Sequence, residues 1–250
     1  MDNKENDELY TWPFLERRFP SFENPDYLGM KSLSGGLQKA IKIALNGKSD
    51  LNVLDVGCGH KPFYPFLKPY SKAYLGTDII KDNPLVDIVC PAENLLIEDR
   101  WADLVICLSV LEHVDDPIKV VKELYRVTKP GGIVFASTHG CFPWHPYPQD
   151  HWRWTQTGLP LLFTKYGEFS DVEIFGTHGT FSGMAFILAH FAYNWTMHRG
   201  KFRRILTKPL VSFINRFGEF IDSRIPQMAD INRHVTAIPE FFVIAKKVSE

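Results

Sequence analysis

Several features that would point to particular classes of protein are scarce or missing in this chain of 250 residues. It has only four cysteines and no CxxC pair, so we expect buried, reduced thiols and a reducing, cytoplasmic compartment. No run of about 18 apolar residues occurs, so no membrane-spanning helix is expected. The polar, acidic N-terminus is unlike a signal peptide. A net charge of −1 gives no overall attraction to nucleic acid.

Strand and helix patterns alternate along the first half of the chain. Five short apolar runs fit strands, at 51–57, 73–79, 86–92, 102–110 and 131–138. Between the last two, apolar residues recur at helical spacing, with Asp116 as the N-cap, Pro117 in the first turn and residues 129–132 as the stop. Apolar strands that alternate with amphipathic helices predict βαβ units and a parallel sheet.

The length suits a single domain with additions. We expect an N-terminal lid or helical region (1–48), a cofactor-binding core (49–179), a helical insertion (180–238) and a last strand (239–248). Within the core, residues 155–167 predict a short helix and residues 170–176 a further strand.

The residues that follow the strands carry the chemistry. Ligands of a parallel sheet bind at the carboxyl ends of its strands, near the switch in strand order. Gly57 and Gly59 let the backbone turn tightly and approach a ligand closely. Asp78 follows about 20 residues later, where a carboxylate suits the two hydroxyls of a ribose. The order and spacing of these residues predict a nucleoside-bearing cofactor rather than simple turns.

A third glycine is missing from this loop. A dinucleotide site reads GxGxxG, and it needs a bare helix N-terminus for the pyrophosphate. Here Pro62 occupies the third position and removes one backbone N–H. NAD and FAD are therefore disfavoured, whereas a cofactor without phosphates needs only the close approach and the ribose carboxylate.

Five segments in order resemble the motifs of class I S-adenosylmethionine-dependent methyltransferases of the type 11 group. They are "VLDVGCG", "LGTDI", "PAENL", "DLVICLSVLEHVDDP" and "VTKPGGIVFAST", and together they cover about residues 50 to 138. The resemblance implies a doubly wound, Rossmann-like α/β fold in three αβα layers. It also implies a seven-stranded sheet with an antiparallel last strand, preceded here by the helical insertion. One departure is Lys61, which replaces the last glycine of the GxGxG pattern common in the family.

The same resemblance implies S-adenosylmethionine as the cofactor and suggests which residues contact it. Asp78 would hold the ribose hydroxyls, Ile79 would pack on the adenine, and Ser109 would approach the methionine end. The implied cofactor-binding residues are Asp55, Gly57, Cys58, Gly59, Asp78, Ile79, Ala92, Glu93, Ser109, Val110 and His113.

Methyl transfer from a sulfonium is an in-line displacement, in which an enzyme mainly supplies proximity and alignment. An oxygen or nitrogen acceptor that carries a proton benefits from a general base. The proline- and aromatic-rich loop after the fifth strand offers candidates, and we predict His145, Asp150 and His151 as catalytic. We predict Tyr147, Trp152 and Arg153 as substrate contacts. The alternative is an aromatic plug with Asp150–Arg153 as a structural ion pair, and no metal is expected.

The predicted function is methyl transfer to a small-molecule or glycan-type acceptor through oxygen or nitrogen. The loop "HPYPQDHWRWT" resembles loops of methyltransferases from surface-polysaccharide gene clusters, which favours a sugar hydroxyl and polysaccharide biosynthesis. Two alternatives are a non-catalytic cofactor-binding or scaffold protein with this fold, and a nicotinamide oxidoreductase, against which Pro62 argues. The chain is expected to be a monomer or a homodimer.

Residues 183–217 do not belong to a minimal fold of this class. The segment is apolar and basic and contains no Asp or Glu. Gly200 and Pro209 are expected to divide it into shorter helices. Three interpretations stay open: helices that cap the core with solvated basic faces, a peripheral contact with lipid or a lipid-linked substrate, and a dimer face.

Overall fold

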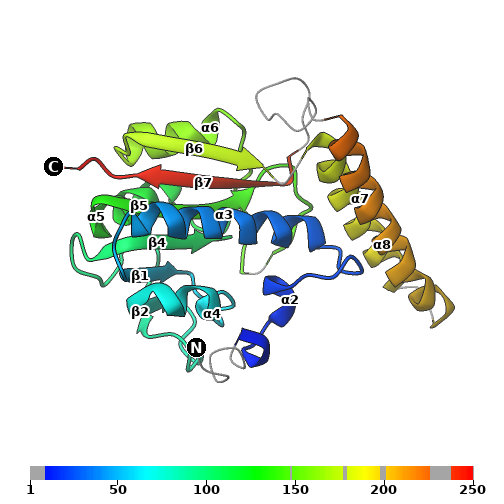
Figure 1. Cartoon of the computed structure of the whole chain (residues 1–250), viewed down its shortest axis with the longest axis horizontal. Helices are drawn as coiled ribbons and strands as arrows, with labels where there is room; N and C mark the ends of the chain where they lie inside the picture. The colour runs from blue at the N-terminus through cyan, green and yellow to red at the C-terminus, as the bar shows by residue number, and fades with distance from the viewer. Residues whose placement is uncertain (1–8, 147, 177–178, 198–200, 226–237, 250) are drawn as a thin grey trace.

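One seven-stranded sheet organises the chain (Figure 1). The computed structural model describes residues 9–146, 148–176, 179–197, 201–225 and 238–249, with the backbone alone for 197 and 201–204. The strand order is β3-β2-β1-β4-β5-β7-β6. The strands are β1 Leu51–Val56, β2 Ser71–Asp78, β3 Ile88–Val89, β4 Ala102–Leu108, β5 Thr128–His139, β6 Asp171–Gly176 and β7 Glu240–Lys246.

Strand direction confirms the predicted Rossmann-like topology. β1 to β5 are parallel, and β7 runs antiparallel between β5 and β6. The chain leaves β1 toward β2 on one side and later returns to β4 on the other. This switch in strand order opens a crevice at the carboxyl ends of β1 and β4, where ligands of doubly wound sheets bind.

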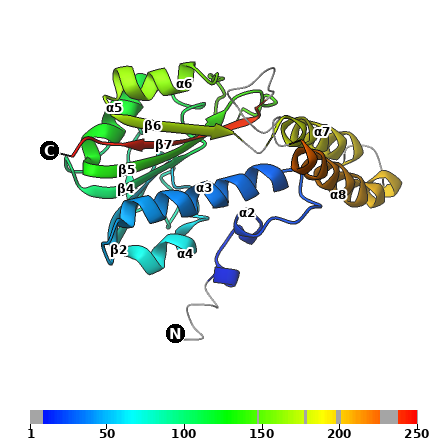
Figure 2. The same cartoon turned by 45° about the horizontal axis from the view of Figure 1, so that its top comes forward.

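Helices cover both faces of the sheet and complete the expected three layers (Figures 1 and 2). α3 and α4 lie on one face, and α5, α6 and η2 lie on the other. The helical elements described are α2 Leu15–Arg18, α3 Tyr27–Leu45, α4 Tyr64–Leu67, η1 Lys68–Tyr70, α5 Pro117–Val127, α6 Gly158–Leu161, η2 Leu162–Tyr166, α7 Thr180–Met197 and α8 Lys201–Arg224.

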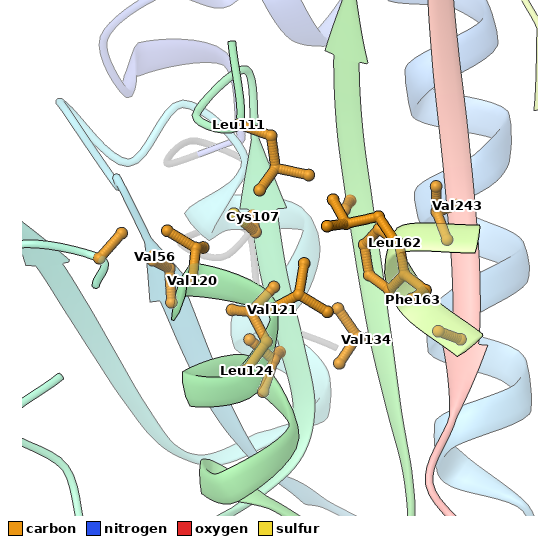
Figure 3. Close-up of a cluster of buried hydrophobic side chains, with 14 of the residues drawn as sticks. Val56, Cys107, Leu111, Val120, Val121, Leu124, Val134, Leu162, Phe163 and Val243 are labelled. Carbon is orange, nitrogen blue, oxygen red and sulfur yellow. The ribbon is translucent and has the colours of Figure 1, made fainter. Parts of the chain in front are cut away.

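The two faces of the central strands are both apolar, as a sheet buried on both sides requires. Side chains alternate along each strand, so Val53 and Leu104 pack toward α3. Val56 and Cys107 point the other way and meet Val121 of α5 (Figure 3). This continuous burial explains why the strand patterns were readable from sequence.

The cysteines are all unpaired, as expected. Cys58, Cys90 and Cys107 are buried, and Cys141 is exposed. Among the residues that the structure describes, no helix is long and apolar enough to cross a membrane.

The predicted helix before β5 is confirmed, with its cap. The Asp116 carboxylate accepts hydrogen bonds from the backbone N–H groups of Ile118 and Lys119, both at 3.1 Å. The helix ends at Val127 and β5 begins at once at Thr128. Residues 129–132, expected as a separate stop, therefore form the irregular first part of β5, where the register with β4 shifts.

The helix after β1 begins only at Tyr64. Lys61 and Pro62 do not start it, because Lys61 lies at φ +51°, outside the helical region. The backbone N–H of Tyr64 bonds to the Lys61 carbonyl at 3.0 Å, and α4 then makes a single turn. The loop between β1 and α4 is consequently long.

The predicted helical insertion is a hairpin of two long helices, α7 and α8, which lie side by side (Figures 1 and 2). The expected division at Pro209 is wrong, since α8 continues through it. Packing against α7 outweighs a local cost of about 3 kcal/mol: Thr207 donates to the Thr196 hydroxyl at 2.6 Å, and a Cβ at Gly218 would lie 2.5 Å from Ala185 Cβ. Gly200 lies outside the described residues.

The hairpin is fastened to the segment just before and inside α3. His190 of α7 contacts Asp26 at 2.7 Å. Asn215 of α8 donates to the carbonyls of Phe22 and Asn24, both at 2.9 Å. Residues far apart in the sequence thus form one wall beside the carboxyl edge of the sheet.

The N-terminal segment also reaches the loop after β1. Trp12 Nε1 donates to the Lys61 carbonyl at 2.9 Å, and the Arg18 guanidinium donates to the Pro62 carbonyl at 2.6 Å. These contacts place residues 12–18 across the glycine loop, the position expected for a lid.

Asp222 provides a test of how the hairpin is stabilised. Its carboxylate accepts from the backbone N–H groups of Phe181, at 3.2 Å, and Ser182, at 2.8 Å, and so caps the start of α7. We expect Asp222→Ala to lower stability by about 1 kcal/mol, or about 2–4 °C in Tm, in thermal unfolding followed by circular dichroism. Asp222→Asn keeps an acceptor oxygen and is expected to lose less. An unchanged Tm for the alanine variant would contradict this role.

Candidate functional site

Two adjoining pockets open at the carboxyl ends of β1, β2 and β4. The larger is a cleft of about 1450 Å³, more than a single small ligand needs. The smaller lies under the N-terminal segment and is lined by Asp55, Gly57, Cys58 and Gly59, among others. The larger is lined by Gly57, Asp78, Ile79, Ala92, Glu93, Ser109, Val110 and His113, among others. All eleven residues that the sequence assigned to the cofactor therefore line one of the two pockets.

The two glycines in the loop after β1 serve different purposes. Gly57 lies at φ +69°, and a Cβ there would sit 2.3 Å from Val110 Cγ2, so only glycine fits between β1 and β4. Gly59 lies at φ +49° and a Cβ there would meet no atom within 4 Å. Its exposed backbone therefore leaves room for a ligand to approach closely.

Lys61 explains the departure from the GxGxG pattern. Its side chain is 9% exposed and turns inward, where Nζ pairs with Asp87 at 2.6 Å. Lys61 lines neither pocket. The residue therefore anchors the loop on β2 rather than facing the ligand, and the ligand side of the loop does not depend on glycine there.

Asp78 fixes the loop and still has lone pairs to offer. One carboxylate oxygen accepts from the Gly59 N–H at 2.8 Å, and the other accepts from the Ile80 N–H at 3.1 Å. A carboxylate has about four acceptor positions, so two are left for a diol. The neighbouring Ile79 is 56% exposed and lines the cleft, so it offers an apolar surface on which a flat base could pack.

Asp55 is buried at the end of β1 and accepts a hydrogen bond from the Tyr74 hydroxyl. Burial raises the pKa of its carboxyl to about 7, while the Tyr74 hydrogen bond and the nearby Lys61 charge act in the opposite direction. A buried carboxyl with this pKa can exist in either charge state near neutral pH, which is common at ligand sites.

The end of β4 is strained. Ser109 lies at φ +54°, a conformation unusual for a residue with a side chain. Its N–H donates to the Ser137 carbonyl at 3.0 Å, which holds the turn against β5. His113 lies in the turn that follows, where its N–H bonds to the Val110 carbonyl at 2.9 Å. Local strain of this kind is concentrated at functional sites.

The inner end of the cleft carries a buried polar cluster, Glu112, His139 and Glu240. His139 Nδ1 lies 3.3 Å from Glu112 Oε1, and its Nε2 lies 3.8 Å from Glu240 Oε1. Glu112 Oε1, His139 Nδ1 and Glu240 Oε2 are buried without a hydrogen-bond partner in the structure. Burying such groups is costly unless a ligand or a shared proton satisfies them.

The sequence analysis did not predict Glu240. The only signal was a single acidic residue in the apolar run "PEFFVIAKK", which is otherwise typical of a buried strand. Pairing of β7 with β5 sets Glu240 directly opposite His139, and this register could not be read from the pattern alone.

Burial sets the charge of this cluster. It raises the pKa of Glu112 to about 7 and that of Glu240 to about 8, the latter also through repulsion by Asp26 and Glu112. Burial lowers the pKa of His139 to about 3, helped by the charge of His145. The imidazole of His139 is therefore neutral at physiological pH, and the two carboxyls can hold protons there.

Among the described residues, Glu112, His113 and His145 form a group whose ligand atoms lie within 4.8 Å of one another, close enough for a metal ion. Two positions in this group are already engaged. His113 Nδ1 contacts the Gln149 carbonyl, and Glu112 Oε2 accepts from the Thr138 hydroxyl at 2.8 Å. Displacement at a sulfonium needs no Lewis acid, so the proposal below uses no metal.

His145 lines the cleft, and Asp150 orients it. The Asp150 carboxylate accepts from the His145 backbone N–H at 3.0 Å and lies 3.4 Å from His145 Nδ1. The Arg153 guanidinium donates to Asp150 Oδ2 at 2.6 Å and holds the pKa of that carboxyl well below its usual range. Burial lowers the pKa of His145, although the Asp150 charge acts against this.

Of the other residues predicted in this loop, those that the structure describes lie outside the cleft lining. His151 is exposed and contacts Gln149 at 2.7 Å, while Trp152 Nε1 donates to the Val114 carbonyl at 2.8 Å. Arg153 is engaged with Asp150, as in the ion-pair alternative. Tyr147 lies outside the described residues.

The fold and the strand-end residues together define a class I, S-adenosylmethionine-dependent methyltransferase. A family model described as a methyltransferase domain matches residues 31–167, more than half of the chain, and the protein belongs to this family. A crystal structure of an S-adenosylmethionine-dependent methyltransferase from Archaeoglobus fulgidus has a TM-score of 0.53 at 18% identity, covering 98% of this chain and 100% of that one. This likeness shows the shared fold.

Two curated relatives extend the comparison. A ubiquinone biosynthesis O-methyltransferase from Pseudomonas entomophila is 37% identical over 112 residues, 39% of this chain and 47% of the relative. The match thus spans about half the length of that relative. Thiol S-methyltransferase TMT1B from Rattus norvegicus is 26% identical over 175 residues, 59% of this chain and 72% of the relative. The chain therefore belongs to a family of methyltransferase domains, and its curated relatives differ in the atom they methylate.

Replacing Asp78 tests the ribose contact. Asp78→Ala removes the charged acceptor and the bond that fixes Gly59, so we expect cofactor binding to weaken by about 1–3 kcal/mol. Calorimetry with S-adenosylhomocysteine measures this. Asp82→Ala, an exposed carboxylate of the same loop that is absent from the cleft lining, is the matched control. Equal affinity of the Asp78 variant and wild type would remove Asp78 from the site.

Glu240 makes stability depend on pH in a defined direction. Its folded-state pKa of about 8 exceeds its ordinary value of 4.5, so the folded protein binds the proton more tightly and stability falls as pH rises between these values. Glu240→Gln does not titrate. Its Tm relative to wild type is expected to rise when the pH is raised across that window, by about 2–4 °C for each kcal/mol of stability that wild type loses. A difference that is constant with pH would show that Glu240 is not buried as described.

Proposed function

We propose that this enzyme transfers the methyl group of S-adenosylmethionine to an oxygen or nitrogen atom of a small-molecule acceptor, with His145 as the general base. One observation carries the proposal. Eight of the eleven residues expected to bind the cofactor line the same cleft as His145, and the cleft is large enough for cofactor and acceptor together.

The chain's own residues would supply position and alignment. Asp78 would hold the ribose, and Gly57 and Gly59 would let the backbone approach the nucleoside. Ser109 and Val110, at the end of β4, would direct the methionine end toward His145. When bound, S-adenosylmethionine supplies an electrophilic methyl group on sulfur, and its leaving group is neutral. The rest of the catalysis is alignment and removal of one proton.

His145 suits the role of base for two reasons. Its lowered pKa keeps the imidazole neutral near physiological pH, so that it can accept a proton. The Asp150 carboxylate faces Nδ1, which leaves Nε2 as the nitrogen available to an acceptor. Arg153 holds Asp150 in place, so we assign Asp150 and Arg153 to positioning His145. His151 lies outside the cleft lining, so the proposal rests on His145 alone.

The polar inner end of the cleft favours an acceptor that carries O–H or N–H groups. His139 and Glu240 line the cleft and have buried atoms without partners, which a donor from the acceptor would satisfy. Phe142 and Phe186 line the same region and offer an apolar surface for a ring. A phenol, an amine and a sugar hydroxyl all meet this description, and a glycan-type acceptor remains part of the proposal. The unpaired thiols support a reducing, cytoplasmic location.

His145→Gln tests the proposal directly. We expect kcat for labelled methyl transfer to fall about 100- to 10,000-fold, while affinity for S-adenosylhomocysteine stays unchanged. The first step is to identify an acceptor by screening phenols, amines and sugars with cofactor labelled in the methyl group. His151→Gln separates the two candidate histidines and is expected to keep activity. Full activity of His145→Gln would overturn its role, and cofactor binding without transfer to any acceptor pool would favour the scaffold alternative.

A further inference from the structure

Glu240 is a buried carboxylate that lines the cleft. The residue is 4% exposed, and its Oε2 has no hydrogen-bond partner among the described residues. On the other side, His139 Nε2 lies 3.8 Å from Glu240 Oε1, beyond the length of a hydrogen bond. Since the lowered pKa of His139 keeps that ring neutral, it brings no positive charge either. A carboxyl group held in this way needs a proton or a cationic ligand to offset the cost of burial.

The nearby cations do not neutralise Glu240. Among the described residues, Lys208 and Arg17 are the Lys and Arg side chains that line the cleft, and Lys208 pairs with Glu23 at 2.9 Å. Arg17 favours the ionised form of Glu240 from a distance and Asp26 opposes it, but Arg17 forms no ion pair with Glu240 in the described part of the chain. Burial and the Asp26 charge raise the pKa of Glu240 to about 8, so in the empty cleft its carboxyl can hold a proton. A bound cation would take the place of that proton.

Aromatic rings lie beside the same carboxylate. A Cβ added at Gly29 would lie 2.5 Å from Glu240 Oε2 and 3.0 Å from Phe186 Cε2, so the oxygen and the ring approach one another there. The Phe142 ring centroid lies 5.6 Å from that of Phe186, and Phe142 stacks on His139 at 4.1 Å. Both phenylalanines line the cleft. Aromatic rings attract ammonium groups, and a carboxylate among such rings is suited to bind one.

The charge of the reacting atom decides between a nitrogen and an oxygen acceptor. An O–H acceptor gains negative charge as it gives up its proton, and the charges of Glu240 and Asp26 oppose this. An amine enters as an ammonium ion, and its methylated product again carries a positive charge near neutral pH. The inner end of the cleft therefore favours a nitrogen acceptor both before and after the transfer.

We propose that the acceptor is an amine, that Glu240 binds its ammonium group, and that the same nitrogen receives the methyl group. This inference rests on the proposed function, because it names the class of acceptor for the same cleft. A glycan-type acceptor would then carry an amino group.

The neighbouring histidines allow one nitrogen to reach both groups that act on it. His139 adjoins Glu240, and its ring centroid lies 4.6 Å from that of His145. An ammonium group has three N–H donors, so it can bond to Glu240 and to His145 Nε2 together. It gives one proton to His145, and the nitrogen lone pair then forms the new N–CH3 bond. The S–CH3 bond breaks in the same step, and its electron pair remains on sulfur.

Calorimetry on protein saturated with S-adenosylhomocysteine tests the ammonium site. The probes are phenethylamine, a cation at neutral pH, and phenethyl alcohol, which has nearly the same shape without the charge. Wild type is expected to bind the amine at least about tenfold more tightly than the alcohol. Glu240→Gln keeps the size of the side chain without its charge and is expected to abolish this preference. Asp115→Asn changes a carboxylate of the same cleft that is 92% exposed, and it is expected to keep the preference.

A second variant tests the aromatic part of the site. Phe142→Leu keeps the carboxylate and removes one ring, so the affinity for phenethylamine is expected to fall about threefold, with a smaller change for the alcohol. Circular dichroism and S-adenosylhomocysteine affinity check that each variant is folded. Equal binding of the two probes by wild type would overturn the inference, as would a full amine preference in folded Glu240→Gln.

Labelled methyl transfer separates this inference from the proposed function. Among acceptors matched in shape, wild type is expected to methylate amines, and Glu240→Gln is expected to raise their KM at least about tenfold. Methylation of hydroxyl acceptors in preference to matched amines would overturn the amine assignment and leave the proposed function standing. An amine preference in binding without transfer to any acceptor would support the ammonium site and count against the proposed function.

Discussion

The close approach of the loops that follow β1 and β4 is the constraint on which the site depends. At the switch in strand order these loops diverge, yet Gly57 must pass Val110 at a distance that leaves no room for a Cβ. This contact fixes where the backbone of the glycine loop lies. The hydrogen bond from the Gly59 N–H to the Asp78 carboxylate then ties the loop to the end of β2. This one crossing places the Asp78 carboxylate, the strained Ser109 turn and the histidines beyond it.

At the inner end of the cleft, the fold buries ionisable side chains at an electrostatic cost. Glu112 and Glu240 are buried in surroundings that raise the pKa of each carboxyl, and some of their oxygens have no partner. An apolar residue at either position would be expected to stabilise the fold more. Polar groups held in such surroundings are typical of places where an enzyme binds polar ligands or moves protons.

Local signals in the sequence predicted the five parallel strands and the residues that follow them, whereas the antiparallel last strand was expected from the family resemblance. Buried parallel strands are apolar throughout, and the residues that follow them face one edge of the sheet. The sequence did not predict that α8 would run through Pro209, because contacts with α7 decide that and helix propensity does not. Nor did it predict Glu240 opposite His139, since an antiparallel register depends on how distant strands align. The loop that carries His145 and His151 was ambiguous for the same reason: which histidine faces the cleft depends on how the loop docks on distant residues, as through the hydrogen bond from Trp152 to the Val114 carbonyl.

The attachment of the hairpin to the N-terminal segment has a consequence for the order of folding. Asn215 bonds to Phe22 across 193 positions of sequence, so one wall of the cleft joins segments made early and late in synthesis. The parallel core between β1 and β5 can collapse on its own, because its contacts are closer in sequence. The N-terminal segment that contains Phe22 can complete these contacts only after α8 has left the ribosome. Until then its aromatic side chains stay exposed to water. A ribosome-bound chain that stops before α8 would therefore lack both the partner of Phe22 and part of the cleft lining.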